Sequence, residues 1–373
     1  MKQKTGITIV MGIMMLLFSC GYETHVINMV HADGSVTRRV IMKGSEPEFD
    51  PEQYRVPVDT TWQIEISADT SGDSDSEWIL TAEKHFAGVE EINEGYRADS
   101  GVNRDLKRSA EFSRRFRWFT TTFRFSETVR PILTVSSPLS EFLDEEELAF
   151  LYMPEKVREG LLNGRDSAMY RELEKRTDSI GEIWMWTSFV RQWTEIFYDR
   201  FGEDPDLRIS REEMHSMEGR LLEQIIADSN SEPEEGEVAG EVNGEEEDDE
   251  LARILIPVAG EAFYREFRSE VDSAGSVLEK MIEPFISTAG YTIEIRMPGK
   301  VVASNGYAGT GAETGGDKYL LWSVSGEYFL AEPYEMWAES QVSNYWTWIV
   351  TALFVLFVIA GLVLRRRKKT NIH

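Results

Sequence analysis

Histidine, serine and carboxylate side chains are the first candidates for chemistry in this chain of 373 residues, because they serve as bases, nucleophiles and metal ligands. The five histidines are His25, His31, His85, His215 and His373. On one extended strand His25 and His31 would share a side but lie about 20 Å apart, too far for a single metal ion. The hydrolase patterns Gly-x-Ser-x-Gly and His-Glu-x-x-His are absent from the sequence. We therefore expect no metal, no cofactor and no enzyme activity.

Cys20 is the only cysteine, and its position indicates a lipid-attachment site. Residues 1–19 have the layout of a signal peptide, with two early lysines and an apolar run that ends at Phe18. The residues Leu17-Phe18-Ser19 resemble the lipobox of bacterial lipoproteins, although Phe18 is bulkier than the residue usual there. The alternative is an ordinary signal peptide followed by a coincidental cysteine. In either case a single cysteine excludes disulfides within the chain and cysteine-rich metal sites.

The other end of the chain predicts a membrane-spanning helix at 345–364. The run from Trp346 to Leu364 is uncharged, and as a helix it would rise about 28 Å, close to the hydrocarbon thickness of a bilayer. Trp346 and Trp348 would form an interfacial aromatic belt on one side. The basic residues that follow the run include Arg365, Arg366 and Arg367. By the positive-inside rule we expect the tail 365–373 in the cytoplasm and the main domain on the outer side of a bacterial cytoplasmic membrane.

Between the two ends, shifts in composition divide the chain into sections. Alternating apolar residues indicate strands in 20–137, three- and four-residue spacing indicates helices in 138–230, and both patterns occur in 251–343. Residues 231–250 contain eleven acidic residues and no basic one, which is typical of a disordered linker. A metal site there is disfavoured because the spaced ligands and turn glycine of a calcium loop are missing. The net charge of −27 argues against nucleic acid as a partner.

The order of strands, helices and strands predicts an α+β fold with an antiparallel sheet from the N- and C-terminal strands and a large helical insertion. Both membrane anchors would then attach to the same sheet. Asp33-Gly34-Ser35 predicts a hairpin turn, and the aromatic run 115–125 predicts one strand covered on both faces. The glycine-rich stretch 306–316 lacks a Gly-Lys-Ser/Thr ending, so it predicts a hairpin loop and not a phosphate-binding loop.

An aromatic stripe marks the helix expected at 182–201. Trp186, Phe189, Trp193 and Phe197 recur at three- and four-residue spacing and form a candidate apolar binding face. The stripe would serve a lipid or a partner protein if exposed, and the protein core if covered. Acidic and basic residues mix on the polar face, whereas interfacial helices carry mainly lysine and arginine there, so the pattern favours core packing.

Both flanks resemble the LppM-like bacterial lipoproteins. The resemblance comes from Cys20 leading into a hairpin with an Asp-Gly turn, from the segment Met297-Pro298-Gly299-Lys300, from Trp322-Ser323-Val324, and from a terminal span with a basic tail. It covers about the first thirty residues and the last eighty, and it does not extend to 139–290. The resemblance implies an envelope-anchored α+β domain with a lipid-binding-like fold.

These patterns lead to one functional hypothesis and two alternatives. We expect a membrane-anchored bacterial envelope lipoprotein whose exported domain binds a lipid-like or apolar ligand or an envelope protein partner, without catalysis. The first alternative is an assembly or scaffold subunit of an envelope complex. The second is a simple single-span membrane protein with a hydrolase activity that its sequence does not reveal.

Overall fold

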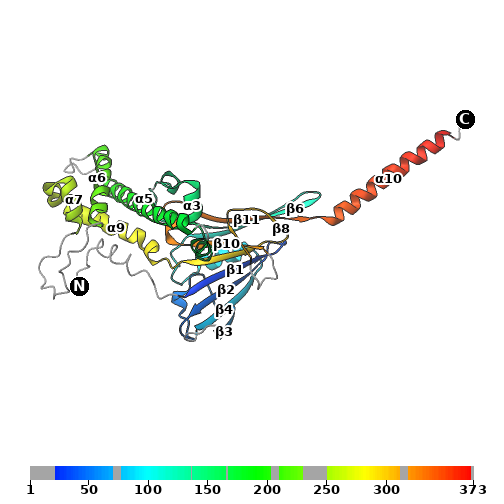
Figure 1. Cartoon of the computed structure of the whole chain (residues 1–373), viewed down its shortest axis with the longest axis horizontal. Coiled ribbons are helices and arrows are strands. Elements are labelled where there is room, and N and C mark those ends of the chain that lie inside the picture. The colour runs from blue at the N-terminus through cyan, green and yellow to red at the C-terminus, as the bar shows by residue number, and fades with distance from the viewer. Residues whose placement is uncertain are drawn as a thin grey trace.

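The computed structural model describes residues 22–69, 77–135, 137–164, 167–202, 210–229, 250–310 and 318–370. The expected signal peptide, Cys20 and nearly all of the acidic segment 231–250 lie outside the described residues. The described part has the predicted α+β fold, with two sheets at the centre, a helical section at one end and helix α10 at the other (Figure 1).

The larger sheet has seven strands and joins the two ends of the chain. Its spatial order is β3 (Gln63–Asp69), β4 (Glu77–Phe86), β2 (Val36–Gly44), β1 (Glu23–Val30), β7 (Tyr291–Arg296), β10 (Lys318–Val324) and β9 (Tyr307–Thr310). Neighbouring strands are antiparallel except β1 and β7, which pair in parallel. The pairing of N- and C-terminal strands is therefore confirmed. The glycine-rich stretch is not all loop, because its first residues form β9 against β10.

The predicted turn at Asp33-Gly34-Ser35 joins β1 and β2. Gly34 has a φ of +97°, a left-handed conformation that glycine adopts without steric cost. The Asp33 side chain accepts a hydrogen bond from the Ser35 backbone N–H at 3.0 Å. The local turn signal in the sequence was sufficient here.

The smaller sheet has four antiparallel strands. Its order is β5 (Arg108–Phe116), β6 (Thr120–Val129), β11 (Tyr334–Ser343) and β8 (Lys300–Ser304). The single strand predicted at 115–125 is wrong, because the chain reverses within that run. The backbone N–H groups of Arg117 and Thr120 each donate to the other residue's carbonyl, at 2.8 and 3.2 Å, and close a tight turn. No glycine, proline, asparagine or aspartate marks this turn, so its sequence resembles strand throughout.

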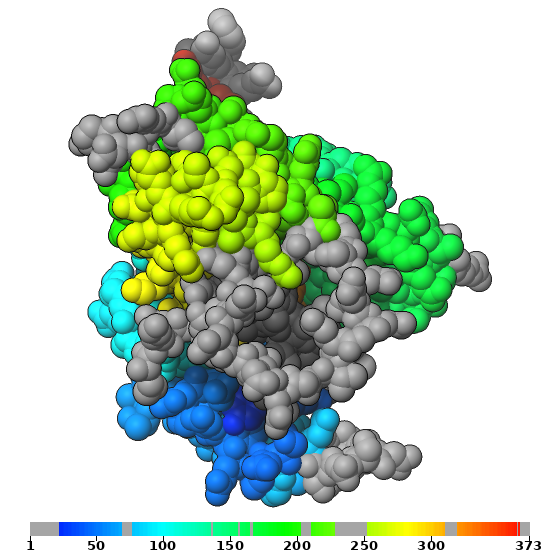
Figure 2. Space-filling model, turned by 90° about the vertical axis from the view of Figure 1, so that its left-hand side faces the viewer, coloured from blue at the N-terminus to red at the C-terminus, as the bar shows by residue number. Residues whose placement is uncertain are grey.

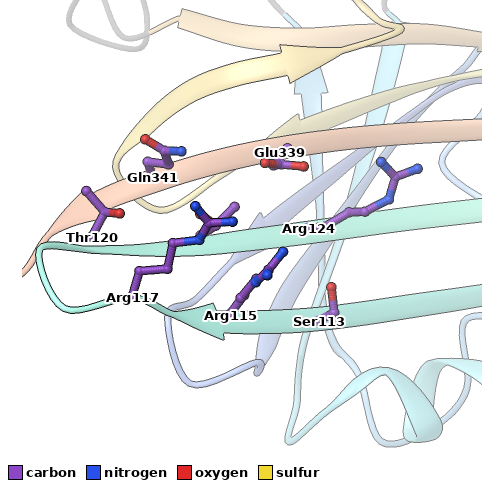
Figure 3. Close-up of a pocket in the computed structure, with 8 residues that line it drawn as sticks. Ser113, Arg115, Arg117, Thr120, Arg124, Glu339 and Gln341 are labelled. Carbon is purple, nitrogen blue, oxygen red and sulfur yellow. The ribbon is translucent and has the colours of Figure 1, made fainter.

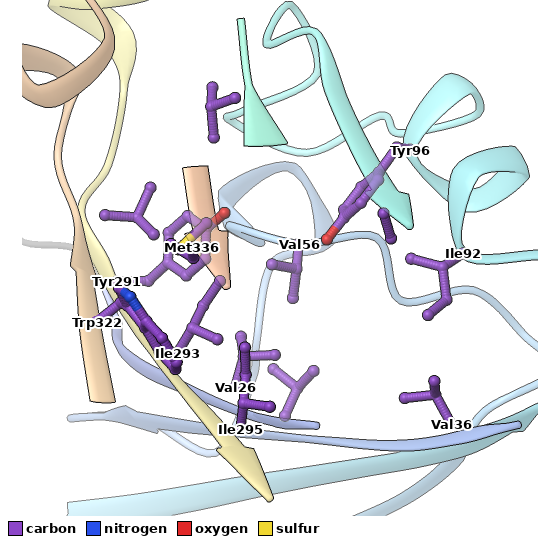
Figure 4. Close-up of a cluster of buried hydrophobic side chains, with 14 of the residues drawn as sticks. Val26, Val36, Val56, Ile92, Tyr96, Tyr291, Ile293, Ile295, Trp322 and Met336 are labelled. Carbon is purple, nitrogen blue, oxygen red and sulfur yellow. The ribbon is translucent and has the colours of Figure 1, made fainter. Parts of the chain in front are cut away.

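The core lies where the inner faces of the two sheets meet, and helix α2 (Val89–Arg97) packs beside it. Figure 4 shows Trp322 and Ile293 of the larger sheet close to Met336 of β11. These three side chains are buried. Packing of large apolar side chains from both sheets fixes the position of the smaller sheet on the larger one.

The helical section follows β6 in the chain and lies at the end of the molecule remote from α10 (Figure 1). Its helices are α3 (Glu145–Leu151), α4 (Glu155–Leu162), α5 (Ser167–Phe201), α6 (Arg211–Ser229), α7 (Glu250–Ala259), α8 (Glu261–Glu266) and α9 (Arg268–Ser287). Figure 2 looks at this end and shows the green and yellow helical segments gathered on one side of the blue strands. Helix α5 is the longest of the section at 35 residues, about 52 Å of helical rise.

The strands next to the two expected anchors belong to different sheets. β1, which follows Cys20, is in the larger sheet, whereas β11, which precedes α10, is in the smaller one. The expectation that both anchors attach to one sheet is therefore wrong. The reason is that β11 pairs with β6, a partner more than 200 residues away, and local patterns do not encode such a pairing.

Candidate functional site

Helix α10 (Tyr345–Thr370) carries the strongest functional feature, a long apolar surface that the rest of the chain leaves uncovered. Its segment Tyr345–Val363 has a mean hydropathy of 2.4, and only 6% of it is buried. Large apolar side chains along it, such as Phe354 and Phe357, are exposed. A soluble protein rarely exposes so continuous an apolar surface. The helix is long and apolar enough to cross a membrane, as predicted from Trp346, Trp348 and the run to Leu364.

The junction between β11 and α10 is a single residue, Asn344, which is tied to the β5–β6 turn. Its backbone N–H donates to the carbonyl of Phe119 at 2.9 Å, and its side-chain amide donates to the carbonyl of Arg117 at 2.8 Å. Its side-chain oxygen accepts from the Thr121 hydroxyl at 2.9 Å. The side-chain amide also donates to the carbonyl of Trp118 at 3.4 Å, so four hydrogen bonds join the hairpin turn to the point where α10 begins.

The turn also contacts the first two turns of α10. The indole N–H of Trp118 donates to the Thr351 hydroxyl at 2.9 Å, six residues after the start of the helix. The ring of Phe119 lies 4.4 Å from that of Trp348, and the ring of Trp118 lies 5.7 Å from that of Trp346. Six residues of helix correspond to about 9 Å, so the turn extends alongside the part of α10 that would occupy the membrane interface.

Trp118 and Phe119 remain substantially exposed despite these contacts. Together with Phe116, Trp346 and Trp348 they make an aromatic cluster, which we call the membrane-proximal cluster. Tryptophan and other amphipathic rings favour the interfacial layer of a bilayer. An interfacial aromatic belt at this point would therefore be larger than the sequence predicted, because a second segment of the chain contributes rings to the cluster. The signal that could have revealed it is the combination of aromatic residues and arginines at 114–119.

A shallow hollow of about 280 Å³ lies on the outer face of the smaller sheet, next to this cluster. Its lining consists of Ser113, Arg115, Arg117, Thr120, Thr122, Arg124, Glu339 and Gln341 (Figure 3). Strand register explains why these residues share a face, since Arg115 pairs with Thr122 and Ser113 with Arg124. Three arginines therefore converge on a surface that contains one lining carboxylate.

The candidate apolar binding face on α5 needs correction. Trp186, Phe189, Trp193 and Phe197 are all buried in the structure. Trp186 and Phe189 pack in a cluster with Leu133, Leu330 and Ile282, while Trp193 and Phe197 pack with residues of α6, α7 and α9. The helices after the acidic segment return to cover the stripe. Core packing, the interpretation that the charge pattern favoured, is what the structure shows.

The histidines do not form a metal site among the described residues, where no group of three or more histidine, cysteine, aspartate or glutamate side chains could hold an ion. His31 directly follows β1 and His85 lies in β4, and their rings lie 5.9 Å apart on either side of the Thr37 hydroxyl. His215 lies between Glu195 and Glu218 on the surface of α5 and α6. Both of its ring nitrogens face carboxylates, an arrangement unlike the serine-histidine pair of a hydrolase.

Comparisons with known proteins found no matching family model, no matching curated protein and no matching solved structure. The resemblance of the flanks to LppM-like lipoproteins therefore stays a prediction, as does acylation of Cys20.

Proposed function

We propose that this protein is a membrane-anchored scaffold of the bacterial envelope, held by α10 and binding a partner protein through its helical section. The observation that carries the proposal is the attachment of the β5–β6 turn to Asn344 and Thr351. A free linker before a spanning helix would let the domain swing, whereas this junction has one residue and is braced by a second segment. The braced junction favours a domain with a fixed orientation on the bilayer.

The helical section is the part best placed for a partner. It lies at the end opposite α10, so an upright domain would present it away from the membrane (Figure 1). The apolar stripe of α5 is buried against the neighbouring helices of the section. Helices α6 to α9 carry more acidic than basic residues. The chemistry of this surface fits a partner with a basic patch.

The interior between the sheets gives less support to the apolar-ligand hypothesis. Large side chains fill it, including the fully buried Trp322, Phe125 and Phe329. The buried Arg38 and Glu127 side chains form an ion pair across it, from β2 to β6. An apolar ligand entering here would have to displace packed side chains and a paired charge, both at high free-energy cost.

Site-specific photocrosslinking in native membranes tests the proposal. A photoreactive residue at exposed Glu212 or Glu223 of α6 should give a discrete adduct with one membrane or envelope protein. The same residue at Glu65 on the exposed surface of β3 is the matched control and should give none. Recovery of monomer alone from all three positions would contradict the scaffold function.

A further inference from the structure

The arginine-lined hollow is not used by the proposed partner contact, and its charges are unbalanced. Arg124 is paired with Glu335 at 3.0 Å and lies over the Trp337 ring at 4.3 Å. Arg115 and Arg117 have no ion pair within the described ranges of the chain, and Arg115 is exposed. Two guanidinium groups therefore remain available on one sheet face, with the hydroxyls of Ser113 and Thr122 beside them.

Hydrogen bonds of the neighbouring backbone and of Trp118 fix the position of these arginines along the axis of α10. The carbonyl of Arg117 accepts the hydrogen bond from Asn344, the residue directly before the helix. Trp118, one residue further, already reaches Thr351 within the helix. Arg115 lies two residues back along β5, about 7 Å from Arg117 in the direction away from the bilayer. Both arginines are thus at the level where lipid headgroups surround a helix that begins to cross the membrane, a layer about 5–8 Å thick.

The positive charge of Arg115 and Arg117 contrasts with the acidic character of the rest of the protein. A chain with a net charge of −27 would be repelled by an anionic bilayer surface. The hollow places positive charge at the one point where the hairpin meets the bilayer. Guanidinium groups bind phosphate through two parallel hydrogen bonds and are more suitable for this than lysine.

Because two guanidinium groups that have no ion pair in the described part of the chain lie beside the start of α10, we propose that Arg115 and Arg117 bind the phosphate groups of anionic phospholipids in the leaflet that α10 enters. The aromatic turn then contacts the interfacial layer, while the arginines contact the headgroups just above it. The inference depends on the proposed membrane orientation of the domain, and it adds a lipid preference that the scaffold function does not require.

Native mass spectrometry of the full-length protein in detergent tests the proposal. The protein is mixed with equal amounts of phosphatidylglycerol and phosphatidylcholine. The wild type should retain phosphatidylglycerol preferentially, and R115Q/R117Q should bind it about tenfold more weakly. The matched control is R114Q/R130Q, which removes the same charge from the same hairpin. Arg114 lies over the Phe123 ring at 5.9 Å on the other face, and Arg130 follows the far end of β6.

Each of the following results would overturn the proposal. Equal losses in R115Q/R117Q and R114Q/R130Q would show that net charge alone matters, and an unchanged preference in R115Q/R117Q would show that the hollow does not bind lipid. Displacement of phosphatidylglycerol by excess inorganic phosphate would identify a site for free phosphate instead of a headgroup site. A spin label at position 119 that is shielded by the bilayer, combined with no lipid preference, would refute this inference alone, whereas a label in water would refute the membrane orientation as well.

Discussion

At the scale of single residues, the most constrained group is the buried cluster around Arg38. Its guanidinium donates to the side-chain oxygen of Asn28 at 2.7 Å and forms an ion pair with Glu127, which also accepts from the Tyr96 hydroxyl. Burial alone would lower the pKa of Arg38, but the negative charge of Glu127 raises it above its usual value. Arg38 therefore stays charged, and the cluster joins β2, β6 and α2. The sequence could not reveal this pairing, because Arg38 sits among apolar residues on an ordinary strand pattern.

Removing the acidic partner should destabilise the protein strongly. In E127Q the Arg38 charge stays buried without a counter-charge, which costs about 3–5 kcal/mol of unfolding free energy. Chemical unfolding of the full-length protein in detergent measures this. The matched control is E83Q, which breaks the half-exposed pair between Glu83 and the neighbouring Arg39 and should cost about 1 kcal/mol or less. Equal effects of the two variants would contradict the structural role of the buried pair.

The pH dependence of stability should depend in part on Glu294 of β7. Burial raises the pKa of this carboxyl, but interactions with His25 and Arg296 outweigh burial and hold it below the ordinary 4.5. Since the folded-state pKa is depressed, Glu294 stabilises the fold at neutral pH, and that contribution is lost as the pH falls below about 4.5. E294Q should therefore melt at a lower temperature than the wild type at pH 7. The gap should close in acid, and a gap that is constant with pH would refute this account.

At the scale of elements, turn chemistry decided which strands the sequence could predict. The β1–β2 hairpin was predictable because Asp33 and Gly34 form a turn on local grounds. The β5–β6 hairpin was missed because Arg117, Trp118 and Phe119 have no intrinsic turn preference. Contacts with Asn344 and α10 stabilise that turn, so tertiary structure replaces the local signal. The α5 stripe was predicted correctly as helix, and its charge pattern correctly favoured burial over binding.

The dependence of the turn on Asn344 can be tested by substitution. N344A removes the three hydrogen bonds of the side chain, with Thr121, Arg117 and Trp118, and should release the turn from α10. Limited digestion with trypsin should then cut at Arg115 or Arg117 several-fold faster than in the wild type. N163A, at the exposed end of α4, is the control and should leave cleavage there unchanged. Equal cleavage in N344A and wild type would show that the turn is stable by itself.

At the scale of the whole molecule, the start of β1 and the end of β11 lie at opposite ends of the two sheets. The Tyr334 hydroxyl at the start of β11 donates to the carbonyl of Ser323, which pairs with Thr292, which in turn pairs with His25 near the start of β1. From Tyr334 the chain extends ten residues, about 33 Å, to the beginning of α10. The start of β1 therefore lies toward the helical section and far from α10 (Figure 1).

This separation changes the picture of two anchors that the sequence suggested. With α10 in the bilayer and the domain upright, Cys20 would precede a strand that starts at the distant end of the domain. The start of β1 would then lie far from the β5–β6 turn and from the membrane interface. Sequence patterns predicted an anchor near each end of the chain, but the distance between β1 and α10 depends on sheet pairings that no local pattern contains. The apolar helix that is long enough to cross a membrane was predictable, because its signal is the composition of one continuous segment.

The β5–β6 turn should lie in the interfacial layer of the bilayer, and spin-label accessibility measures this location most directly. Full-length C20A protein is reconstituted into bilayers with one label at F119C in the turn, or with one at E212C on the exposed start of α6. The account predicts that the label at 119 is accessible to oxygen and shielded from a water-soluble nickel complex, as expected in the interfacial layer, while the label at 212 shows the reverse. Equal exposure of both labels to the nickel complex would contradict the account.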